Sequence, residues 1–276
     1  MKIFLYTACA LAGFAFNSIL CRLALKTDEI DAASFTLIRI ASGAVTLVVI
    51  SFFINRTEKL RGNWFSAFFL FAYAVCFSMA YVSLTTATGA LVLFGSVQAT
   101  MILAAVVSGE RPRVWEWIGL LTALGGLIYL VFPGLSAPPF FSSALMAAAG
   151  IAWGFYTLRG RGAGNPLAET AGNFTRAVPL AVLSALPLMA QIHLSNKGLV
   201  LAVLSGAIAS GIGYSIWYAA LKFHTRSRAS ILQLAVPVIA AAGGVIFLSE
   251  EIALRLILAT AFIIGGISVA IFGRKK

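Results

Sequence analysis

The sequence predicts an all-α integral membrane protein built from ten transmembrane helices. Three observations lead to this fold class. Hydrophobic residues make up 61% of the 276-residue chain and charged residues only 11%, and the mean hydropathy is +0.97. The apolar residues form ten runs of about 20 residues, the length that crosses a bilayer as a helix. The charges fall in short clusters between these runs, which indicates membrane topology rather than a nucleic-acid-binding face, despite the net charge of +11.

The first half of the chain contains five expected spans. The first follows a single lysine and lacks a small-residue cleavage site, so we expect a retained helix rather than a cleaved signal peptide. The second carries Arg39 inside an otherwise apolar run, and the third carries aromatic residues at every fourth position. The fourth and fifth are apolar and meet at a basic connection. The expected spans are Ile3–Ala24, Ser34–Ile54, Trp64–Leu84, Thr88–Ser108 and Val114–Phe132.

The second half contains five further expected spans. The seventh carries Arg176 in its interior. The ninth carries Pro237, which has no N–H, so the carbonyl of Gln233 four residues earlier is left free and the helix has a candidate hinge. The connections are short, and we expect a single transmembrane domain over residues 1–276. These spans are Phe140–Leu158, Ala168–Ile192, Leu199–Leu221, Ala229–Leu248 and Ala253–Phe272.

The lysines and arginines between the spans predict the orientation. With the N-terminus inside, most of them fall on the inner side, and only Arg22, Lys26, Lys197 and Arg255 fall on the outer side. Because cytoplasmic loops carry the excess of Lys and Arg, both termini are expected in the cytoplasm. The expected location is the inner membrane of a bacterial cell.

A shift of the first half by 137 residues reveals an internal repeat. It places Arg22 on Arg159 and Arg39 on Arg176. The same shift pairs Phe16 with Trp153, Phe77 with Tyr214, Ser78 with Ser215, and Tyr81 with Tyr218. The repeats cover about 1–135 and 138–276. Since each holds five spans, an odd number, the second is expected to be inverted in the membrane relative to the first, as in many secondary transporters.

Several motifs resemble one known family. V-S-G-E-R-P-R-V-W-E-W-I-G-L-L-T-A-L-G-G (Val107–Gly126) and F-L-S-E-E-I-A-L-R-L-I-L-A-T-A-F-I-I-G-G (Phe247–Gly266) resemble matching helix junctions of the drug/metabolite transporter superfamily, in its ten-helix EamA-like branch. F-T-L-I-R and N-F-T-R resemble the segments that open the second helix of each repeat. The resemblance implies a secondary transporter. The aromatic amino-acid exporters of the YddG type within this family look similar in length and character.

Arg39 and Arg176 allow two interpretations. Each could reach its own membrane interface or cap loop carbonyls on a neighbouring helix, which is a structural role. Alternatively, one could be a counter-charge for a substrate carboxylate or part of a gate. Because the two lie near opposite membrane faces, they cannot both reach one central site, and we favour the structural role over the counter-charge, with gating as a further possibility for either.

The residue types that are missing from the spans limit the class of substrate. No Asp or Glu lies in the middle of a span, which argues against a carboxylate-based exporter of cationic drugs. Central lysines that would suit phosphorylated substrates are also missing. The expected substrate is therefore neutral overall, and zwitterionic molecules fit. Aromatic residues at helical spacing can instead be packing or lipid-facing residues, whereas amides within the membrane need partners. The candidate substrate-binding residues are Asn17, Phe77, Tyr81, Gln98, Trp153, Tyr214, Tyr218 and Gln233.

The predicted function is export of neutral or zwitterionic metabolites, foremost hydrophobic or aromatic amino acids, by alternating access. Efflux of lipophilic drugs or another neutral metabolite is the alternative. The three cysteines and two histidines form no metal or catalytic pattern, so we expect no cofactor, no metal and no enzyme activity. The expected partners are a small-molecule substrate and membrane lipid, without nucleic acid or an obligate protein partner.

Overall fold

The computed structural model describes residues 2–54, 60–107, 109, 114–132, 137–160, 164–221, 223, 232–233 and 235–272. Helices dominate the described residues, and their β-structure is limited to one isolated antiparallel bridge between Ile30 and Leu194. The helices of the first half are α1 (Lys2–Lys26), α2 (Ala32–Ile54), α3 (Trp64–Tyr81), α4 (Thr86–Val107) and α5 (Val114–Val131). Those of the second half are α6 (Phe140–Arg159), α7 (Pro166–Ala185), α8 (Asn196–Val203), α9 (Gly213–Leu221), α11 (Ala235–Leu248) and α12 (Leu254–Phe272).

The ten expected spans are all present as helical segments. Among the described residues, six helices are long and apolar enough to cross a membrane. Three shorter apolar helices, Trp117–Leu130, Ala235–Leu248 and Leu254–Val269, belong to the fifth, ninth and tenth spans. The remaining span is α7. The eighth span is continuous from α8 through a π-helical stretch, η2 (Leu204–Ile212), into α9. The fold class predicted from the sequence, an all-α membrane protein with ten helices, is confirmed.

Local chemistry explains where several helices begin and end. The side chains of Asn63, Asn165 and Ser195 accept hydrogen bonds from backbone N–H groups in the first turns of α3, α7 and α8, as N-cap residues do. The seventh span was expected to run to Ile192, but the α-helix ends at Ala185 and continues as a 3₁₀ segment, η1 (Leu186–Gln191). Pro187 lies in this segment and cannot donate the N–H that an α-helix requires there.

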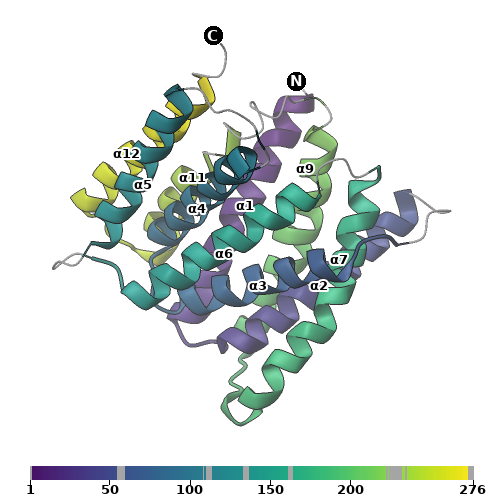
Figure 1. Ribbon diagram of the computed structural model, residues 1–276. Coiled ribbons are helices and arrows are strands. Elements are labelled where there is room, and N and C mark those ends of the chain that lie inside the picture. The colour runs from purple at the N-terminus through teal and green to yellow at the C-terminus, as the bar shows by residue number, and fades with distance from the viewer. Residues whose placement is uncertain are drawn as a thin grey trace.

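The helices pack in a pattern that brings the two halves together. Helix α2 packs against α7, α5 against α12, and α6 against both α3 and α4. Helix α1 packs against α9, η2 and α11 (Figure 1). Both chain termini lie at the top of Figure 1. We call the side of the bundle with the termini the terminal side, and the opposite side the distal side.

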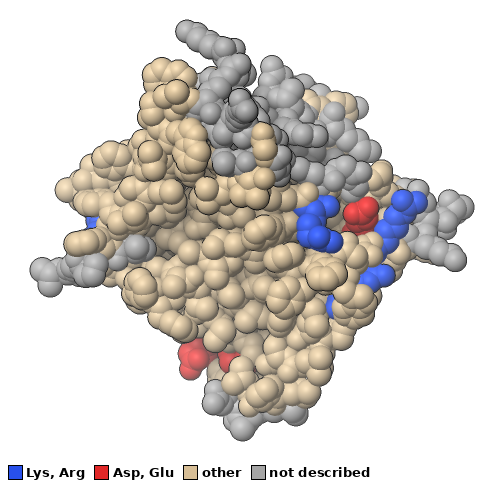
Figure 2. Space-filling view, viewed as in Figure 1, with Lys and Arg blue, Asp and Glu red and all other residues tan. Residues whose placement is uncertain are grey.

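The described surface is largely apolar. Figure 2 shows a broad area without charge, with basic and acidic side chains mainly to the right and acidic ones at the lower edge. Many large apolar side chains of the helices are exposed, among them Phe52, Phe68, Leu121 and Ile246. A soluble protein rarely exposes so much contiguous apolar surface, whereas a lipid-facing belt requires it.

Candidate functional site

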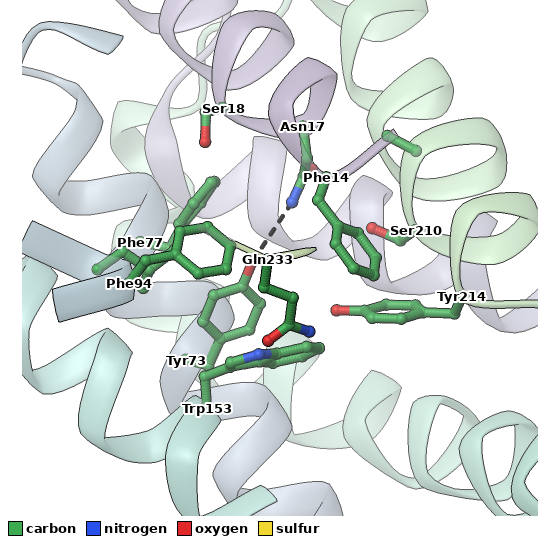
Figure 3. A pocket seen from close by; sticks show the side chains of 12 residues that line it. Phe14, Asn17, Ser18, Tyr73, Phe77, Phe94, Trp153, Ser210, Tyr214 and Gln233 are labelled. Carbon is green, nitrogen blue, oxygen red and sulfur yellow. Dashed lines mark hydrogen bonds between the residues drawn. The ribbon is translucent and has the colours of Figure 1, made fainter. Parts of the chain in front are cut away.

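A pocket lies among the helices that join the two halves. Helices α1, α3 and α4 contribute one part of its lining, and α6, η2, α9 and residue 233 contribute the other. Figure 3 shows the side chains around it. The lining residues are Phe14, Asn17, Ser18, Tyr73, Phe77, Leu93, Phe94, Trp153, Ala209, Ser210, Tyr214 and Gln233.

Aromatic rings form a continuous wall of this pocket. The Trp153 ring centroid lies 4.8 Å from that of Tyr73 and 5.3 Å from that of Tyr214, on which it stacks. Tyr73 also contacts Phe77, with centroids 5.3 Å apart, and Tyr214 contacts Phe14 at 5.6 Å. Such offset and tilted pairs are favourable ring geometries. The wall therefore offers flat apolar faces and π-electron density to a bound molecule.

Neutral polar groups complete the lining. The amide Nδ2 of Asn17 donates to the Tyr73 hydroxyl at 3.3 Å, and the Ser205 hydroxyl donates to Asn17 Oδ1 at 2.5 Å. The amide of Gln233 and the hydroxyl of Tyr214 also point into the pocket (Figure 3). Ser210 is 1% exposed, and its hydroxyl has no hydrogen-bond partner among the described residues. None of the described lining residues is acidic or basic.

The pocket is contracted in this conformation. The space open to the centres of water molecules is about 20 Å³, and one water molecule needs about 10–15 Å³ by this measure. An amino acid or a drug does not fit without movement of the surrounding helices or side chains. The structure therefore represents a closed form of the site.

Arg39 lies directly behind the aromatic wall. This residue of α2 is 2% exposed, and its Nη2 donates to the hydroxyl of Tyr73 at 2.9 Å. Its guanidinium carbon lies 5.2 Å from the ring centroid of Tyr73 and 4.8 Å from that of Phe77. These distances are typical of cation–π contacts. The other terminal nitrogen, Nη1, has no hydrogen-bond partner within the described part of the chain.

Arg176 lies in a different environment, on the terminal side. Its Nη1 donates to the backbone carbonyl of Arg61 in the connection before α3, and to the carbonyl of Gly172 one turn earlier in α7, both at 2.9 Å. The side chain is partly exposed. Arg176 thus caps carbonyls of a loop and a helix, which is the structural role considered from the sequence.

A cluster of charged side chains closes the distal side of the bundle. Arg22 of α1 pairs with Glu250, 3.4 Å from Nε to Oε1, and donates to the carbonyls of Tyr81 and Val82 at 2.9 and 2.8 Å. The other carboxylate oxygen of Glu250 accepts from the backbone N–H of Thr86 at the start of α4, at 2.8 Å. This cluster therefore ties α1 to the α3–α4 and α11–α12 connections.

Five of the eight predicted substrate-binding residues line the pocket: Asn17, Phe77, Trp153, Tyr214 and Gln233. Tyr81 is not brought to it, because its ring is fully buried beneath Phe77 and its hydroxyl donates to the carbonyl of Thr86.

The remaining predicted residues have other positions. Gln98 is buried outside the pocket lining, and its Nε2 has no partner among the described residues. The side chain of Tyr218 lies outside the described residues. Pro237 is the third residue of α11 and is buried, in the first turn of the described helix rather than in its middle. Its function as a hinge stays a prediction.

Sequence reasoning left several lining residues out of the candidate set. Phe14, Ser18, Tyr73 and Phe94 all face the pocket. Tyr73 had a usable signal, since it precedes Phe77 by four residues and must share its helix face. Phe14 had no such signal, because both the interior and the lipid-facing sides of α1 carry phenylalanine.

No group of three or more His, Cys, Asp or Glu in the described part of the chain is arranged to hold a metal ion. The polar atoms at the pocket are amide, hydroxyl and indole groups, together with the guanidinium behind the wall. This set can hold an uncharged or zwitterionic molecule by hydrogen bonds, ring contacts and one positive charge.

Comparison with known proteins identifies the class. The sequence pattern of the EamA-like transporter family matches residues 1–132 and, a second time, residues 141–272. The chain therefore belongs to the EamA-like transporter family, a branch of the drug/metabolite transporter superfamily, and is a multi-pass membrane protein.

Several individual proteins are similar to this chain over most of its length. An uncharacterized protein of Pseudomonas aeruginosa is 49% identical over 271 residues, which cover 98% of this chain and 94% of that protein. The threonine/homoserine exporter RhtA of Escherichia coli K12 is 30% identical over 81% of this chain and 76% of its own length. RhtA of Salmonella typhimurium is 30% identical over 85% of this chain and 80% of its own length. A crystal structure with 20% identity superposes with a TM-score of 0.68 over 97% of both chains and shares the fold.

Proposed function

We propose that this protein is a secondary transporter of the bacterial inner membrane that exports neutral, zwitterionic amino acids by alternating access. The observation that carries the proposal is the pocket between the halves. Its lining combines aromatic faces with amides and hydroxyls, and none of its described residues is acidic. An exporter of cations by proton exchange needs a membrane-embedded carboxylate, and this site offers none to a cation.

The lining suits two kinds of amino-acid side chain. The rings of Trp153, Tyr214 and Phe77 fit the hydrophobic or aromatic side chains expected from the sequence. The RhtA relatives are named as exporters of threonine and homoserine, which are small and hydroxylated. Ser210 and Gln233 supply groups that can hydrogen-bond such a hydroxyl. Efflux of lipophilic drugs or of another neutral metabolite is the alternative, favoured only by the apolar part of the wall.

The transport mechanism in this proposal uses two inverted halves. The family pattern matches each half separately, which supports a duplicated origin. The helix–helix contacts also repeat: a contact between two helices has a counterpart between the equivalent helices of the other half. Helix α3 packs on α6 as α1 packs on the eighth span, and α4 packs on α6 as α1 packs on α11. Inverted repeats that rock around a central site are the usual basis of alternating access.

The proposed orientation places the terminal side in the cytoplasm, following the distribution of Lys and Arg between the spans. The distal side then faces outward, and the Arg22–Glu250 cluster closes the outer end of the bundle. In this proposal the cluster must loosen before substrate leaves to the outside.

Counterflow in proteoliposomes tests the function. The purified protein is reconstituted in vesicles preloaded with unlabelled threonine, phenylalanine or a lipophilic drug, and uptake of labelled threonine and labelled phenylalanine is measured. Saturable uptake that an internal amino acid accelerates is the expected result, with protein-free vesicles as the control. A proton ionophore distinguishes facilitated diffusion, which it leaves unchanged, from proton exchange.

Each outcome has a defined meaning. Preference for threonine over phenylalanine would assign the small hydroxylated class, and the reverse would assign the aromatic class. If neither amino acid drives counterflow in protein that is monodisperse and folded, the amino-acid proposal fails. Counterflow driven by the drug alone would then establish the alternative.

A further inference from the structure

Arg39 is a buried cation without an anion. Its side chain is 2% exposed in the middle of the bundle, and no carboxylate among the described residues pairs with it. Nη2 has a neutral partner, the Tyr73 hydroxyl, and Nη1 has none in the described part of the chain. An isolated charge moved out of water carries a large cost unless it is paired and hydrogen-bonded. One neutral hydrogen bond and two cation–π contacts offset this cost only in part.

Two other arginines, Arg22 and Arg176, show what a structural role looks like. The partly exposed Arg255 also has a buried Nη1 without a partner among the described residues, but its Nη2 donates to the carbonyl of Phe132. Arg176 donates to two backbone carbonyls from a partly exposed position, and Arg22 has two carbonyls and the carboxylate of Glu250. Both therefore have at least two fixed acceptors. Arg39 keeps a donor unused although it is the most deeply buried of the three.

Tyr73 connects Arg39 to the pocket. Its ring lines the pocket, and its hydroxyl oxygen accepts from both Arg39 Nη2 and Asn17 Nδ2. A tyrosine hydroxyl also donates one hydrogen, and that hydrogen has no acceptor among the described residues. The cation polarises the hydroxyl and strengthens it as a donor. The Tyr73 hydroxyl and Nη1 of Arg39 are thus two unused donors on the same side of the site.

We propose that Arg39 and Tyr73 form a carboxylate-binding subsite, which holds the α-carboxylate of the transported molecule. This inference rests on the proposed amino-acid transport and names the group that such a substrate must carry. The carboxylate accepts from the Tyr73 hydroxyl and, as the Tyr73–Phe77 wall shifts on opening of the contracted pocket, from Nη1 of Arg39. The buried positive charge then gains an ion pair at the moment of binding.

The lining residues from the second half suit the ammonium group. The hydroxyl oxygen of Ser210 is buried, lines the pocket and lacks a partner among the described residues. The carbonyl oxygen of Gln233 and the faces of Trp153 and Tyr214 add a neutral acceptor and π-electron density. Tyr73 and Ser210 are 137 residues apart and hold equivalent positions in the two halves. The site therefore has a positive end from one half and a neutral, accepting end from the other.

The backbone holds Arg39 in place for this role. A Cβ atom built on Gly206 of η2 would clash with the carbonyl oxygen of Arg39, so η2 approaches α2 closely at this residue. Glycine allows such an approach because it has no side chain. The guanidinium is thus presented from a fixed point of the fold rather than from a mobile segment.

The test compares amino acids with analogues that lack the carboxylate. Threonine and phenylalanine compete with their own amides, threoninamide and phenylalaninamide, for counterflow of the labelled amino acid. The wild type is expected to prefer the free acid. Arg39→Gln removes the charge, and Arg176→Gln removes the equivalent charge in the other half as the matched control. Charge-assisted hydrogen bonds predict that Arg39→Gln raises the half-saturating amino-acid concentration by about 10–100-fold.

The decisive readout is the preference for acid over amide. Arg39→Gln is expected to lose it, Arg39→Lys to keep part of it, and Arg176→Gln to keep all of it. If a folded Arg39→Gln protein keeps the wild-type preference, or if the wild type binds the amides equally well, the subsite is refuted. Should Arg39→Gln fail to fold, Tyr73→Phe decides, because it removes only the hydroxyl. Reduced preference in that variant supports the subsite, and unchanged preference refutes it.

Failure of the transport proposal can be told apart from failure of the subsite. If neither amino acid drives counterflow in the wild type, thermal stabilisation by 3-phenylpropionate and by phenethylamine is compared for the full chain in detergent. Stabilisation by the carboxylate that Arg39→Gln abolishes supports an anion subsite for another substrate. Equal stabilisation of both proteins, or none by the carboxylate, refutes it.

Discussion

Arg39 and Arg176 stand 137 residues apart at equivalent positions of the two halves, yet one faces the pocket wall and the other caps a loop. The residue on the neighbouring helix explains the difference. Arg39 meets Tyr73, whereas the position equivalent to Tyr73 in the second half is Ser210, whose short side chain carries no ring and no distant hydroxyl. Arg176 turns instead to the carbonyls of Arg61 and Gly172. The two halves share the same arrangement of helices but carry different side chains at equivalent positions.

The same contrast appears at the two sides of the bundle. Arg22 is buried with Glu250 on the distal side, whereas its equivalent, Arg159, is exposed and donates to Ser66 and Asn63 at 3.2 Å on the terminal side. An ion pair joins the helices on the distal side, whereas hydrogen bonds to an amide and a hydroxyl group join them on the terminal side. This difference predicts that matched substitutions in the two halves have unequal effects.

The largest difference in thermal stability is expected between breaking the Arg22–Glu250 contact and breaking the contacts of Arg159. Glu250→Ala leaves Arg22 buried without its carboxylate and removes the acceptor of the Thr86 N–H, and the loss of one partner of a buried pair costs about 3–5 kcal/mol. Arg159→Ala removes exposed contacts, for which about 0–1 kcal/mol is typical. Thermal denaturation of both variants in detergent measures the difference. Equal losses of thermal stability would contradict the contrast between the sides.

A smaller difference, in the half-saturating substrate concentration, is expected between substitutions of Phe16 and Trp153, which also hold equivalent positions. Trp153 lines the pocket between Tyr73 and Tyr214, whereas Phe16 is 44% exposed and contacts Phe247. Ring contacts are worth about 0.5–1.5 kcal/mol each, so Trp153→Ala is expected to raise the half-saturating substrate concentration about tenfold. Phe16→Ala is expected to leave it unchanged. Counterflow normalised to folded protein measures both, and a similar shift in the two variants would argue against the proposed site.

The fold was predictable from the sequence because the bilayer imposes a simple rule. A run of about 20 apolar residues must form a helix to satisfy its backbone in lipid, whatever its neighbours are. The ten runs therefore gave ten helical segments. The helix ends were less predictable: α3 ends at Tyr81 rather than at Leu84, and the seventh span changes to a 3₁₀ segment after Ala185.

The pocket was predictable only in part, since apolar side chains suit both the lipid and the interior of the bundle. Amides were no better a guide than rings. Asn17 and Gln233 line the pocket and Gln98 does not, and among the predicted rings Tyr81 does not. Phe14 and Phe16 are two residues apart on α1, and only the rotation of that helix against α9 and α11 decides which faces the pocket. That rotation depends on packing between helices distant in the sequence. The unequal surroundings of Arg39 and Arg176 likewise required the structure.

The smallest expected effect concerns a contact on each side at which the connection before a helix meets another part of the chain. We call these two contacts crossings. On the distal side, Glu29 accepts from the Ser195 hydroxyl at 2.6 Å and from Lys197 Nζ at 2.9 Å. The hydrogen bond from Ser195, followed by that from Lys197, lowers the pKa of the Glu29 carboxyl below its usual value. On the terminal side, the corresponding crossing uses an amide, with the Asn63 N–H donating to Asn173 Oδ1 at 2.9 Å. Only the distal crossing can titrate.

The two crossings are therefore expected to differ in their pH dependence. Because the folded-state pKa of Glu29 is depressed, its contribution is fully present above the unfolded value of about 4.3 and is lost as the pH falls through the folded value. The difference in thermal stability between wild type and Glu29→Gln should be small at neutral pH and vanish in acid. The difference between wild type and Asn173→Ala should stay constant over the same range, since an amide does not titrate. A Glu29→Gln difference that persists in acid would show that Ser195 and Lys197 stabilise this side without the carboxylate charge, and the contrast between the two sides would then be one of packing alone.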